Sequence, residues 1–353
     1  MIHNLHTQRG KAVMRNLAAV TALALSMAVS TTQAGTTLDA VQKKGFLQCG
    51  VNTGFAGFSA PDKKGHWRGL DVDVCRAVSA ALFGDVDKVN KVKYTPLTAK
   101  ERFIALQSGE VDILSRNTSW TITRDTVLGL NFAGVSFYDG QGFMVKKDLG
   151  VNSALELDGA TVCTGAGTTT ELNLADYCRE HNMQCKLIAF DSRDQTFAAF
   201  RDGRCDVLTG DSSSLYSNRL EHPNPDSVKI LPEIISKEPL GPLVRQGDDK
   251  WFNLVKWSLF ALINAEEMGI TSKNVDKMKS HSNPSVQRFL GVGGNMGKGL
   301  GLSKDWAYNI VKQVGHYGEV FDRNVGKDSP LKMERGLNAL WNKGGIMYAP
   351  PIR

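Results

Sequence analysis

Along this 353-residue chain, stretches whose apolar residues are spaced as in buried strands alternate with stretches spaced as in amphipathic helices. Residues 45–51 form a short apolar run typical of a strand. Residues 70–83 are typical of an amphipathic helix, with one apolar face made of Leu70, Val74, Ala77, Val78 and Ala81. A second strand region surrounds Tyr94, and Thr98 begins the next helix. Because strands and helices follow one another, the pattern predicts an α/β fold whose mostly parallel sheet is covered on both faces.

A partial internal repeat indicates two similar lobes. Residues 102–117 and 196–211 share five residue types at the same offsets: Phe103 and Phe197, Ala105 and Ala199, Gly109 and Gly203, Asp112 and Asp206, Leu114 and Leu208. In each copy a helix that ends at a glycine leads into a buried strand. Open α/β sheets bind ligands at the carboxyl ends of their strands, so polar groups that follow these strands are candidate ligands.

The two copies deliver groups of opposite charge. In the first copy, the apolar residues 111–114 run into hydroxyl and amide side chains, followed by a helix start that carries Arg124 in its first turn. A guanidinium beside a helix N-terminus favours a carboxylate or phosphate. The alternative is a polar turn with a surface arginine. The second copy delivers Asp211, a partner for a positive group.

Two glycine-containing segments add candidate walls for a site. In the loop 52–58, glycines let the backbone approach a ligand, and Phe55 or Phe58 can cover its apolar part while the other joins the core. Residues 165–171 start a helix at 171–180 but lack the glycine and lysine signatures of nucleotide loops. The N–H groups there and the hydroxyls of Thr168 and Thr169 can hold a small anion, or simply cap the helix.

The later chain is predicted to return to the first lobe. Residues 230–244 are proline-rich and extended, and residues 249–267 form a long amphipathic helix. A helical tail follows, and residues 341–353 are expected to strap over the first lobe. The predicted division is residues 35–143 for the first lobe, 144–238 for the second, and 239–353 for the return and the extension.

The N-terminus has the pattern of a secretory signal. Arg9, Lys11 and Arg15 precede the apolar residues 17–29, and small residues allow cleavage after Ala34. Residues 1–34 are therefore predicted to be removed on export, with an uncleaved anchor as the alternative. The formal charge of +6 loses three basic residues with this segment, which leaves a mature chain near +3. That balance does not favour nucleic acid as a partner.

Six cysteines follow the signal, and an even count in an exported chain indicates disulfides. Six cysteines allow many pairings. We favour the set that keeps each bond within one lobe: Cys49 with Cys75, Cys163 with Cys205, and Cys178 with Cys185. No Cys-x-x-Cys pair or other metal-ligand cluster is present in the sequence, and we expect no cofactor.

Several stretches together resemble one protein family. These are GFLQCGVNTGFAGFSAPD, WRGLDVDVCRAV, GEVDILSRNTSWTITRD, GAGTTTELNLADYC and the C-terminal GLNALWNKGGIMYAPPIR. They are similar to the general L-amino acid receptors of ABC transporters, among the family 3 solute-binding proteins of the periplasm. The resemblance covers nearly the whole mature chain. It implies a two-lobed type II periplasmic binding protein fold, in which two crossing strands join parallel-rich sheets, with a helical C-terminal extension.

The resemblance also implies roles for particular residues. Arg124 would take the α-carboxylate of a free L-amino acid, and Asp211 would take its α-ammonium group. Phe55 would cover the ligand. The groups implied to assist Arg124 are Asn117, Ser119, Thr168 and Thr169. Arg116 stands where receptors for basic amino acids carry serine, and we expect it to favour acidic and amide side chains.

The expected partners are a free amino acid and the permease subunits in the inner membrane, and the protein is expected to be a monomer. Two other classes remain open. An enzyme on the same scaffold, such as a dehydratase of prephenate-like acids, would need a general acid or base, and the histidines have no catalytic spacing. A sensory module would normally continue into a membrane span or signalling domain, which this sequence does not show.

Overall fold

The computed structural model describes residues 36–86 and 91–353, and the predicted signal segment lies outside these ranges. Residues 36–136 and 241–353 build a first lobe around one five-stranded sheet. Its strands, in order, are β4 (Val92–Leu97), β1 (Leu47–Asn52), β5 (Ile113–Leu114), β14 (Leu243–Arg245) and β6 (Leu130–Phe132). The strands β4, β1 and β5 are parallel, whereas β14 returns antiparallel to β5 and β6.

Residues 141–230 build a second lobe around a similar sheet. Its strands, in order, are β10 (Lys186–Phe190), β9 (Thr161–Gly165), β11 (Val207–Asp211), β8 (Gln141–Lys146) and β12 (Val228–Ile230). Again the first three are parallel and β8 is antiparallel to both of its neighbours. Its helices are α5 (Thr169–Glu180), α6 (Arg193–Arg201) and α7 (Ser212–Glu221). The α/β class and the parallel-rich sheets expected from the sequence are confirmed.

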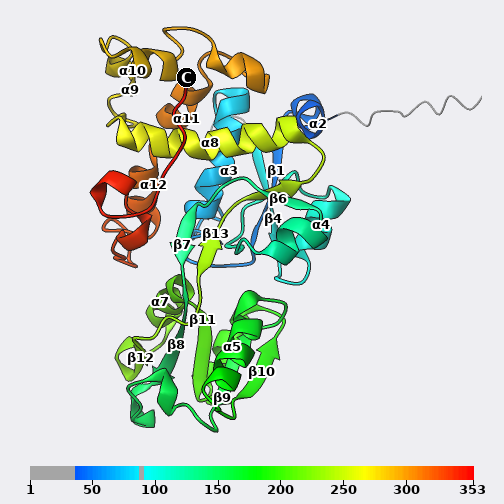
Figure 1. Ribbon diagram of the computed structural model, residues 1–353, viewed down its shortest axis with the longest axis vertical. Helices are drawn as coiled ribbons and strands as arrows, with labels where there is room; N and C mark the ends of the chain where they lie inside the picture. The colour runs from blue at the N-terminus through cyan, green and yellow to red at the C-terminus, as the bar shows by residue number, and fades with distance from the viewer. Residues whose placement is uncertain (1–35, 87–90) are drawn as a thin grey trace, which may run out of the picture. The chain divides into compact units, whose positions relative to one another are not determined.

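Two short antiparallel strands connect the lobes. They are β7 (Phe137–Asp139) and β13 (Glu238–Leu240), which run side by side between the sheets (Figure 1). The strand β8 follows β7 directly in the chain, and it belongs to the second sheet. Residues 141–143, which the sequence analysis assigned to the first lobe, therefore lie in the second, because the crossing occurs one strand earlier in the chain.

The internal repeat is visible in the backbone. Gly109 and Gly203 both have φ near +80°, a conformation that favours glycine, where the chain leaves its helix (82° and 79°). Asp112 and Asp206 then each bind the start of a neighbouring strand. Their carboxylates accept the N–H groups of Gln48 (2.7 Å) and Thr161 (2.8 Å). The matched offsets in the sequence thus correspond to matched turns and strand contacts.

The first lobe has more helical cover than the second. Its helices before the crossing are α2 (Thr37–Lys44), α3 (Leu70–Phe83) and α4 (Arg102–Ser108), and a small hairpin joins β2 (Ala60–Pro61) to β3 (Trp67–Arg68). After the return come α8 (Asp249–Glu267), α9 (Val275–Met278), α10 (Pro284–Phe289), α11 (Trp306–Val314) and α12 (Tyr317–Asn324). The bounds predicted for α3 and α8 agree with the structure.

The helix α3 is buried on more than the one face that its periodicity predicted. Both α8 and α11 pack against it. Asp73, on the face expected to meet solvent, is buried and accepts hydrogen bonds from Arg323 (2.7 Å) and Asn324 (2.6 Å) of α12. The expectation of a one-sided helix was wrong because the C-terminal extension supplies a second layer, with polar partners for the acidic residues.

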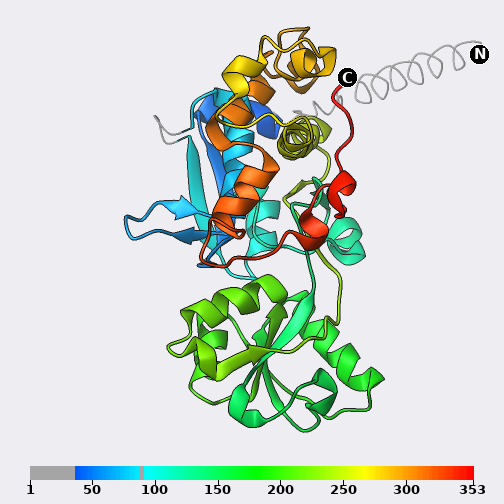
Figure 2. The same ribbon diagram turned by 90° about the vertical axis from the view of Figure 1, so that its left-hand side faces the viewer.

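The extension, residues 270–353, also touches the crossing strands. The amide of Asn338 pairs with both backbone groups of Tyr138 in β7, at 2.7 and 3.0 Å. The Tyr317 hydroxyl donates to the carbonyl of Ser136 (2.8 Å). Beyond Asn338 the chain runs along the first lobe (Figure 2) and adds Met347 to its core, as expected for a strap.

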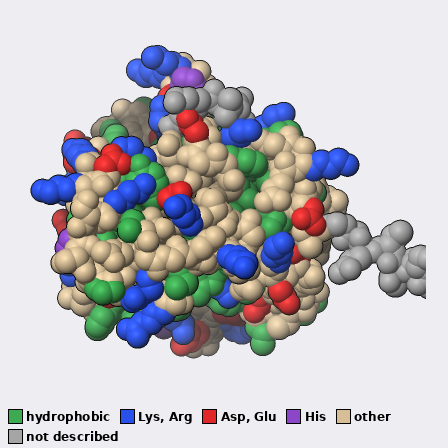
Figure 3. Space-filling model, turned by 90° about the horizontal axis from the view of Figure 1, so that it is seen from above, with side chains coloured by type: hydrophobic (Ala, Val, Ile, Leu, Met, Phe, Trp, Pro, Cys, Tyr) green, Lys and Arg blue, Asp and Glu red, His purple; other side chains and the backbone are tan. Residues whose placement is uncertain are grey.

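The outer surface of this region is mixed, and exposed apolar side chains such as Trp341 and Tyr348 lie on it. On the face shown in Figure 3, basic and acidic side chains are interspersed, and neither sign gathers into one large patch. Among residues 36–86 and 91–353, no helix has the length and apolar content needed to cross a membrane.

All three predicted disulfides are present. Cys49 is bonded to Cys75, Cys163 to Cys205, and Cys178 to Cys185. The first bond ties β1 to α3 within the first lobe, and the other two lie within the second lobe. No bond crosses between the lobes, so the disulfides stiffen each lobe without restraining a motion between them.

The disulfides should differ in their effect on stability. Cys163–Cys205 spans 42 residues and Cys178–Cys185 spans 7. By loop-closure entropy, replacing the first pair with alanine should lower the free energy of unfolding by roughly 4 kcal/mol, and replacing the second by roughly 2 kcal/mol. Urea unfolding of the two double variants measures this difference, and an equal or reversed loss would contradict it.

Candidate functional site

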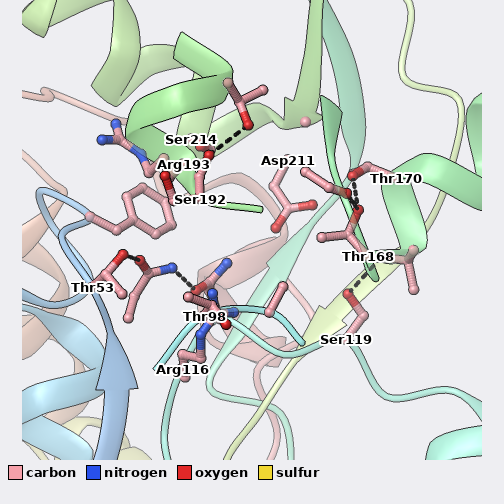
Figure 4. Close-up of a pocket in the computed structure, with 18 of the residues that line it drawn as sticks. Thr53, Thr98, Arg116, Ser119, Thr168, Thr170, Ser192, Arg193, Asp211 and Ser214 are labelled. Carbon is pink, nitrogen blue, oxygen red and sulfur yellow. Dashed lines mark hydrogen bonds between the residues drawn. The ribbon is translucent and has the colours of Figure 1, made fainter. Parts of the chain in front are cut away.

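A cavity of about 110 Å³ lies between the two lobes. Its lining comes from the carboxyl ends of strands in both sheets and from the adjoining turns, as the repeat predicted. All eight residues proposed from the sequence line this one cavity: Phe55, Arg116, Asn117, Ser119, Arg124, Thr168, Thr169 and Asp211. Figure 4 shows Asp211 and Arg116 reaching toward it from opposite sides.

The lobes touch one another around this cavity. Lys100 of the first lobe pairs with Asp191 of the second at 2.5 Å, although both side chains are largely exposed. Arg193 of the second lobe donates to the carbonyl of Gly54 (3.3 Å). These contacts describe a closed arrangement. The exposed ion pair contributes little to it, since such pairs are typically worth about 0–1 kcal/mol.

The loop that follows β5 is held in place by hydrogen bonds to Asp71 of α3. Its carboxylate accepts the N–H of Asn117 (2.8 Å) and the hydroxyl of Ser115 (3.3 Å). Asn117 itself has a positive φ of 29°. Burial raises the pKa of Asp71 to about 7, while the hydrogen bond from Asn117 acts in the opposite direction. A helical residue therefore fixes the conformation of the loop that carries the site.

Arg124 is placed by a short π-helical turn, η1 (Thr123–Val127), in place of the regular helix expected there. Its guanidinium donates to the carbonyl of Ser119 (2.8 Å) and lies 5.2 Å from the ring of Phe103. These contacts orient the side chain but leave much of its hydrogen-bonding capacity for a ligand.

Three guanidinium groups of the first lobe line the cavity. Arg102, Arg116 and Arg124 are 3%, 6% and 7% exposed. Within residues 36–86 and 91–353 none of them forms an ion pair, and their hydrogen-bond acceptors are neutral oxygens of Thr118, Leu97 and Ser119. The Nε atom of Arg102 is buried without any partner.

No acidic side chain of the described residues lies at ion-pair distance from these guanidinium groups, although Asp211 and Glu238 attract Arg102 and Arg124 from further away. Burial lowers the pKa of Arg102 well below its usual range, and repulsion from Arg116 and Arg124 lowers it further. Burial lowers the pKa of Arg116 to about 10, and burial likewise lowers the pKa of Arg124. The first lobe therefore offers a dry, positive wall that an anion would stabilise.

The second lobe presents the opposite charge. Asp211 ends β11, is 8% exposed, and its carboxylate has no hydrogen-bond or ion-pair partner among the described residues. Burial raises the pKa of Asp211 well above its usual range, and the carboxylates of Asp139 and Glu238 raise it further. Burial also raises the pKa of Asp139 to about 6. A cation at Asp211 would relieve this cost.

The hydroxyl groups near Arg124 are already engaged. Ser119 and Thr169 both donate to the carboxylate of Glu238, the latter at 2.9 Å. The Thr168 hydroxyl accepts the N–H of Glu171 (3.3 Å) and so caps α5. In this closed form the Ser119 and Thr169 hydroxyls bind an internal carboxylate, and the Thr168 hydroxyl caps the helix, as in the alternative stated from the sequence.

Backbone donors remain available at the same place. Among the described residues, the N–H groups of Ser119, Thr169 and Thr170 have no acceptor. Two of them belong to the first turn of α5, where helix geometry leaves N–H groups unpaired and favours negative charge. With Arg124 they are the candidate donors for an anion site.

The two phenylalanines of the loop 52–58 divide their roles as expected, with one at the cavity and the other only in the core. The Phe55 ring lines the cavity, and Phe58 stacks beneath it in the core with ring centroids 4.4 Å apart. Arg193 lies 5.5 Å above Phe55 and is held by both oxygens of Glu221, at 3.0 and 3.1 Å.

Some functional side chains were missed from the sequence. Arg102 begins α4 and looked like an ordinary charged residue at a helix start, but its counterpart in the repeat, Thr196, also lines the cavity. The repeat therefore held a usable signal for Arg102. For Glu238 no signal existed, because its donors come from residues far away in the chain.

Comparison with known proteins now adds to this geometry. The profile of the bacterial extracellular solute-binding proteins, family 3, matches residues 47–274. The chain belongs to this family. The match ends where the C-terminal extension begins, so the profile covers the two lobes.

Full-length relatives share the extension as well. The general L-amino acid-binding periplasmic protein AapJ of Rhizobium johnstonii is 61% identical over 95% of this chain and 98% of its own length. The glutamate/glutamine/aspartate/asparagine-binding protein BztA of Rhodobacter capsulatus is 50% identical over 96% of this chain and 100% of its own length. A solved periplasmic binding protein from Brucella ovis with glutathione bound is 57% identical. It covers 90% of this chain and 100% of that one, with a TM-score of 0.88.

These relatives establish the class of this family 3 protein. They are binding proteins of amino-acid transport and not enzymes, so the dehydratase alternative is set aside. The two-lobed type II periplasmic binding protein fold is confirmed by the same comparisons.

The buried carboxyl groups predict a pH dependence of stability. The pKa of Asp71 is raised to about 7 in the folded protein, so between about pH 4 and 7 the native state holds a proton that the unfolded state has lost. The free energy of unfolding should therefore fall as pH rises, by up to about 1.4 kcal/mol per pH unit from this group.

Urea unfolding of the ligand-free protein across this pH range measures that slope. The Asp71→Asn variant should flatten it, whereas Asp62→Asn should not, because the pKa of the exposed Asp62 is lowered by its hydrogen bond from the backbone of His66. An unchanged slope in Asp71→Asn would contradict the assignment.

Proposed function

We propose that this chain is the substrate-binding component of an amino-acid ABC transporter, exported to the periplasm, that captures one free L-amino acid between its lobes. The observation that carries the proposal is the pair of buried, unpartnered charges across one cavity. Asp211 takes the α-ammonium group. Arg124 takes the α-carboxylate together with the amides of Ser119, Thr169 and Thr170.

The energetics of a zwitterion explain why both lobes are needed. Removing its two charged ends from water costs several kcal/mol per ion unless each end finds a partner. Each charge-assisted hydrogen bond contributes about 1.5–3 kcal/mol. A full set therefore offsets the cost of desolvation and gives a net binding free energy of roughly 8 kcal/mol, which corresponds to micromolar affinity. Neither lobe holds the full set alone. Ligand therefore stabilises the closed form through contacts that the open form lacks.

The remaining arginines point to the side-chain class. After Arg124 is matched to the α-carboxylate, Arg102 and Arg116 still line the cavity without an acidic partner in the described chain. They fit the acidic or amide end of glutamate, aspartate, glutamine or asparagine. The relative BztA, named as a glutamate/glutamine/aspartate/asparagine-binding protein, supports the same class of ligand.

Closure about β7 and β13 is the signal that inner-membrane permease subunits would read. Export fits the signal pattern of residues 1–34 and the disulfides, which persist in oxidising compartments. The periplasmic names of the relatives support this location. The receptor acts as a monomer in this proposal, since both halves of the site belong to one chain.

A second ligand class is favoured by one observation. The Brucella ovis relative was solved with glutathione bound. Glutathione carries an α-amino acid end and, further along, a second carboxylate, so the same cavity could hold its γ-glutamyl end against Asp211 and Arg124 and direct its distal carboxylate toward another arginine.

A thermal-shift screen with the twenty L-amino acids, two D-enantiomers and glutathione tests the proposal. Glutamate, aspartate and their amides should raise Tm more than lysine or leucine, and D-glutamate should raise it less than L-glutamate. A screen in which no amino acid raises Tm would refute the receptor function, and a shift with glutathione alone would select the peptide class.

Removing the charge of Asp211 should abolish tight binding. In Asp211→Asn the shape is kept while the ligand ammonium loses the carboxylate proposed to bind it, a loss of about 3–5 kcal/mol or at least a hundredfold in Kd. Because the Asp211 charge is uncompensated, the variant should unfold at the same Tm as wild type or higher. Calorimetry measures the first effect and thermal unfolding the second.

The matched control is Asp202→Asn, which removes the same charge from an exposed site on the second lobe. It should leave Kd unchanged. Equal affinity in Asp211→Asn and wild type would overturn the placement of the ammonium group.

Arg116 should set the preference for a charged side chain. Arg116→Ser should weaken glutamate binding by about tenfold or more and glutamine binding less, because a carboxylate loses a charge-assisted contact and an amide loses a weaker one. Competition calorimetry with the two ligands gives the ratio. A glutamate-to-glutamine ratio that stays at the wild-type value would contradict the role of Arg116.

A further inference from the structure

Glu238, in the crossing strand β13, accepts four hydrogen bonds, two of them from residues that line the cavity. It is 1% exposed, and Oε2 accepts from the hydroxyls of Ser119 and Thr169. Oε1 accepts from the amide of Asn173 (2.8 Å) and the hydroxyl of Ser236 (2.7 Å). All four donors are neutral.

These donors come from three separate parts of the molecule. Ser119 belongs to the first lobe, Thr169 and Asn173 belong to the second lobe, and Ser236 lies in the returning segment beside Glu238. Within the described chain Glu238 has no cationic partner at ion-pair distance. A buried carboxylate without a cation depends on its hydrogen bonds, so each lost donor is costly.

The position of Glu238 makes this network sensitive to closure. It pairs with Asp139 of β7 in the two-stranded connection, so it lies on the axis about which the lobes can rotate. Ser119 and Thr169 approach it from opposite lobes, and their hydroxyl oxygens are only 3.4 Å apart. Rotation that opens the cleft must separate these two hydroxyls, and Glu238 cannot then keep both.

We infer that Glu238 is a positioning residue that favours the closed receptor before any ligand binds, by collecting hydroxyl donors from both lobes on one carboxylate oxygen. The inference deepens the proposed function and rests on it for the role of closure in capture. In this role Glu238 does not contact the ligand. The hydroxyls of Ser119 and Thr169 donate to Glu238, and the free backbone amides donate to the ligand in their place.

Two consequences follow from this role. The ligand-free protein should spend part of its time closed, since the network needs no ligand to form. Loss of the network should also weaken every ligand by a similar factor, because the cost of closure is common to all of them. A residue that touches the ligand side chain would instead change the order of preference.

Small-angle X-ray scattering of the ligand-free protein tests the inference directly. Glu238→Ala should increase the radius of gyration relative to wild type, and saturating glutamate should bring both proteins to the same value. Glu238→Gln keeps the shape, one acceptor oxygen and one NH₂ group, and should give an intermediate value. Calorimetry should show binding to Glu238→Ala weakened about tenfold for glutamate and glutamine alike.

Glu233→Ala is the matched control. Glu233 lies in the same returning segment and accepts a hydroxyl from Ser153 (2.6 Å), but both residues are on the second-lobe side of the connection. Its scattering curve should equal that of wild type. Equal ligand-free curves for Glu238→Ala and wild type, or equal opening in Glu233→Ala, would overturn the inference.

The scattering comparison also separates this inference from the proposed function. If the wild-type protein binds no amino acid while Glu238→Ala still opens, the receptor assignment fails and the closure role stands. If wild type binds amino acids and Glu238→Ala stays closed, the closure role fails alone.

Discussion

A buried charge without an ion-pair partner is costly, and this protein holds such charges on both sides of one cavity. The first lobe contributes three guanidinium groups, and the second contributes Asp211. These arginines and Asp211 line one cavity, but within the described chain they form no ion pair with one another. A ligand that carries both charges can satisfy both walls at once. In the proposed function, ligand binding stabilises the closed form, because only that form brings the two walls within reach of the same molecule.

The rest of the fold keeps these walls rigid while leaving the connection between them free to bend. Disulfides lie within lobes, and Asp71 braces the loop that carries Asn117. The C-terminal extension thickens the first lobe and holds β7 through Asn338, on the side of the hinge that belongs to this lobe. Glu238 adds a contact common to both lobes at the hinge itself. These contacts stiffen the lobes, and in the proposed function the lobes rotate about the two short connecting strands.

The sequence was informative wherever one local segment determines the outcome. Matched offsets around Gly109 and Gly203 predicted two helix-to-strand units, and those units placed Asn117 and Asp211 at the carboxyl ends of strands that face one cavity. The sequence was uninformative where partners are distant. The burial of Asp73 depends on α12, some 250 residues away, and the role of Glu238 depends on hydroxyls from both lobes. The hydroxyls of Ser119 and Thr169 could be recognised from the sequence as site groups. Their hydrogen bonds to the internal carboxylate of Glu238 could not be predicted.

The central claim is that opposite lobes bind opposite ends of one zwitterion. A crystal structure of the protein with L-glutamate tests it most directly. The account predicts the α-ammonium group within hydrogen-bonding distance of Asp211, the α-carboxylate at Arg124 and the amides of α5, and the side-chain carboxylate toward Arg102 and Arg116. A ligand bound outside this cavity, or bound inside it with its ammonium group away from Asp211, would contradict the account.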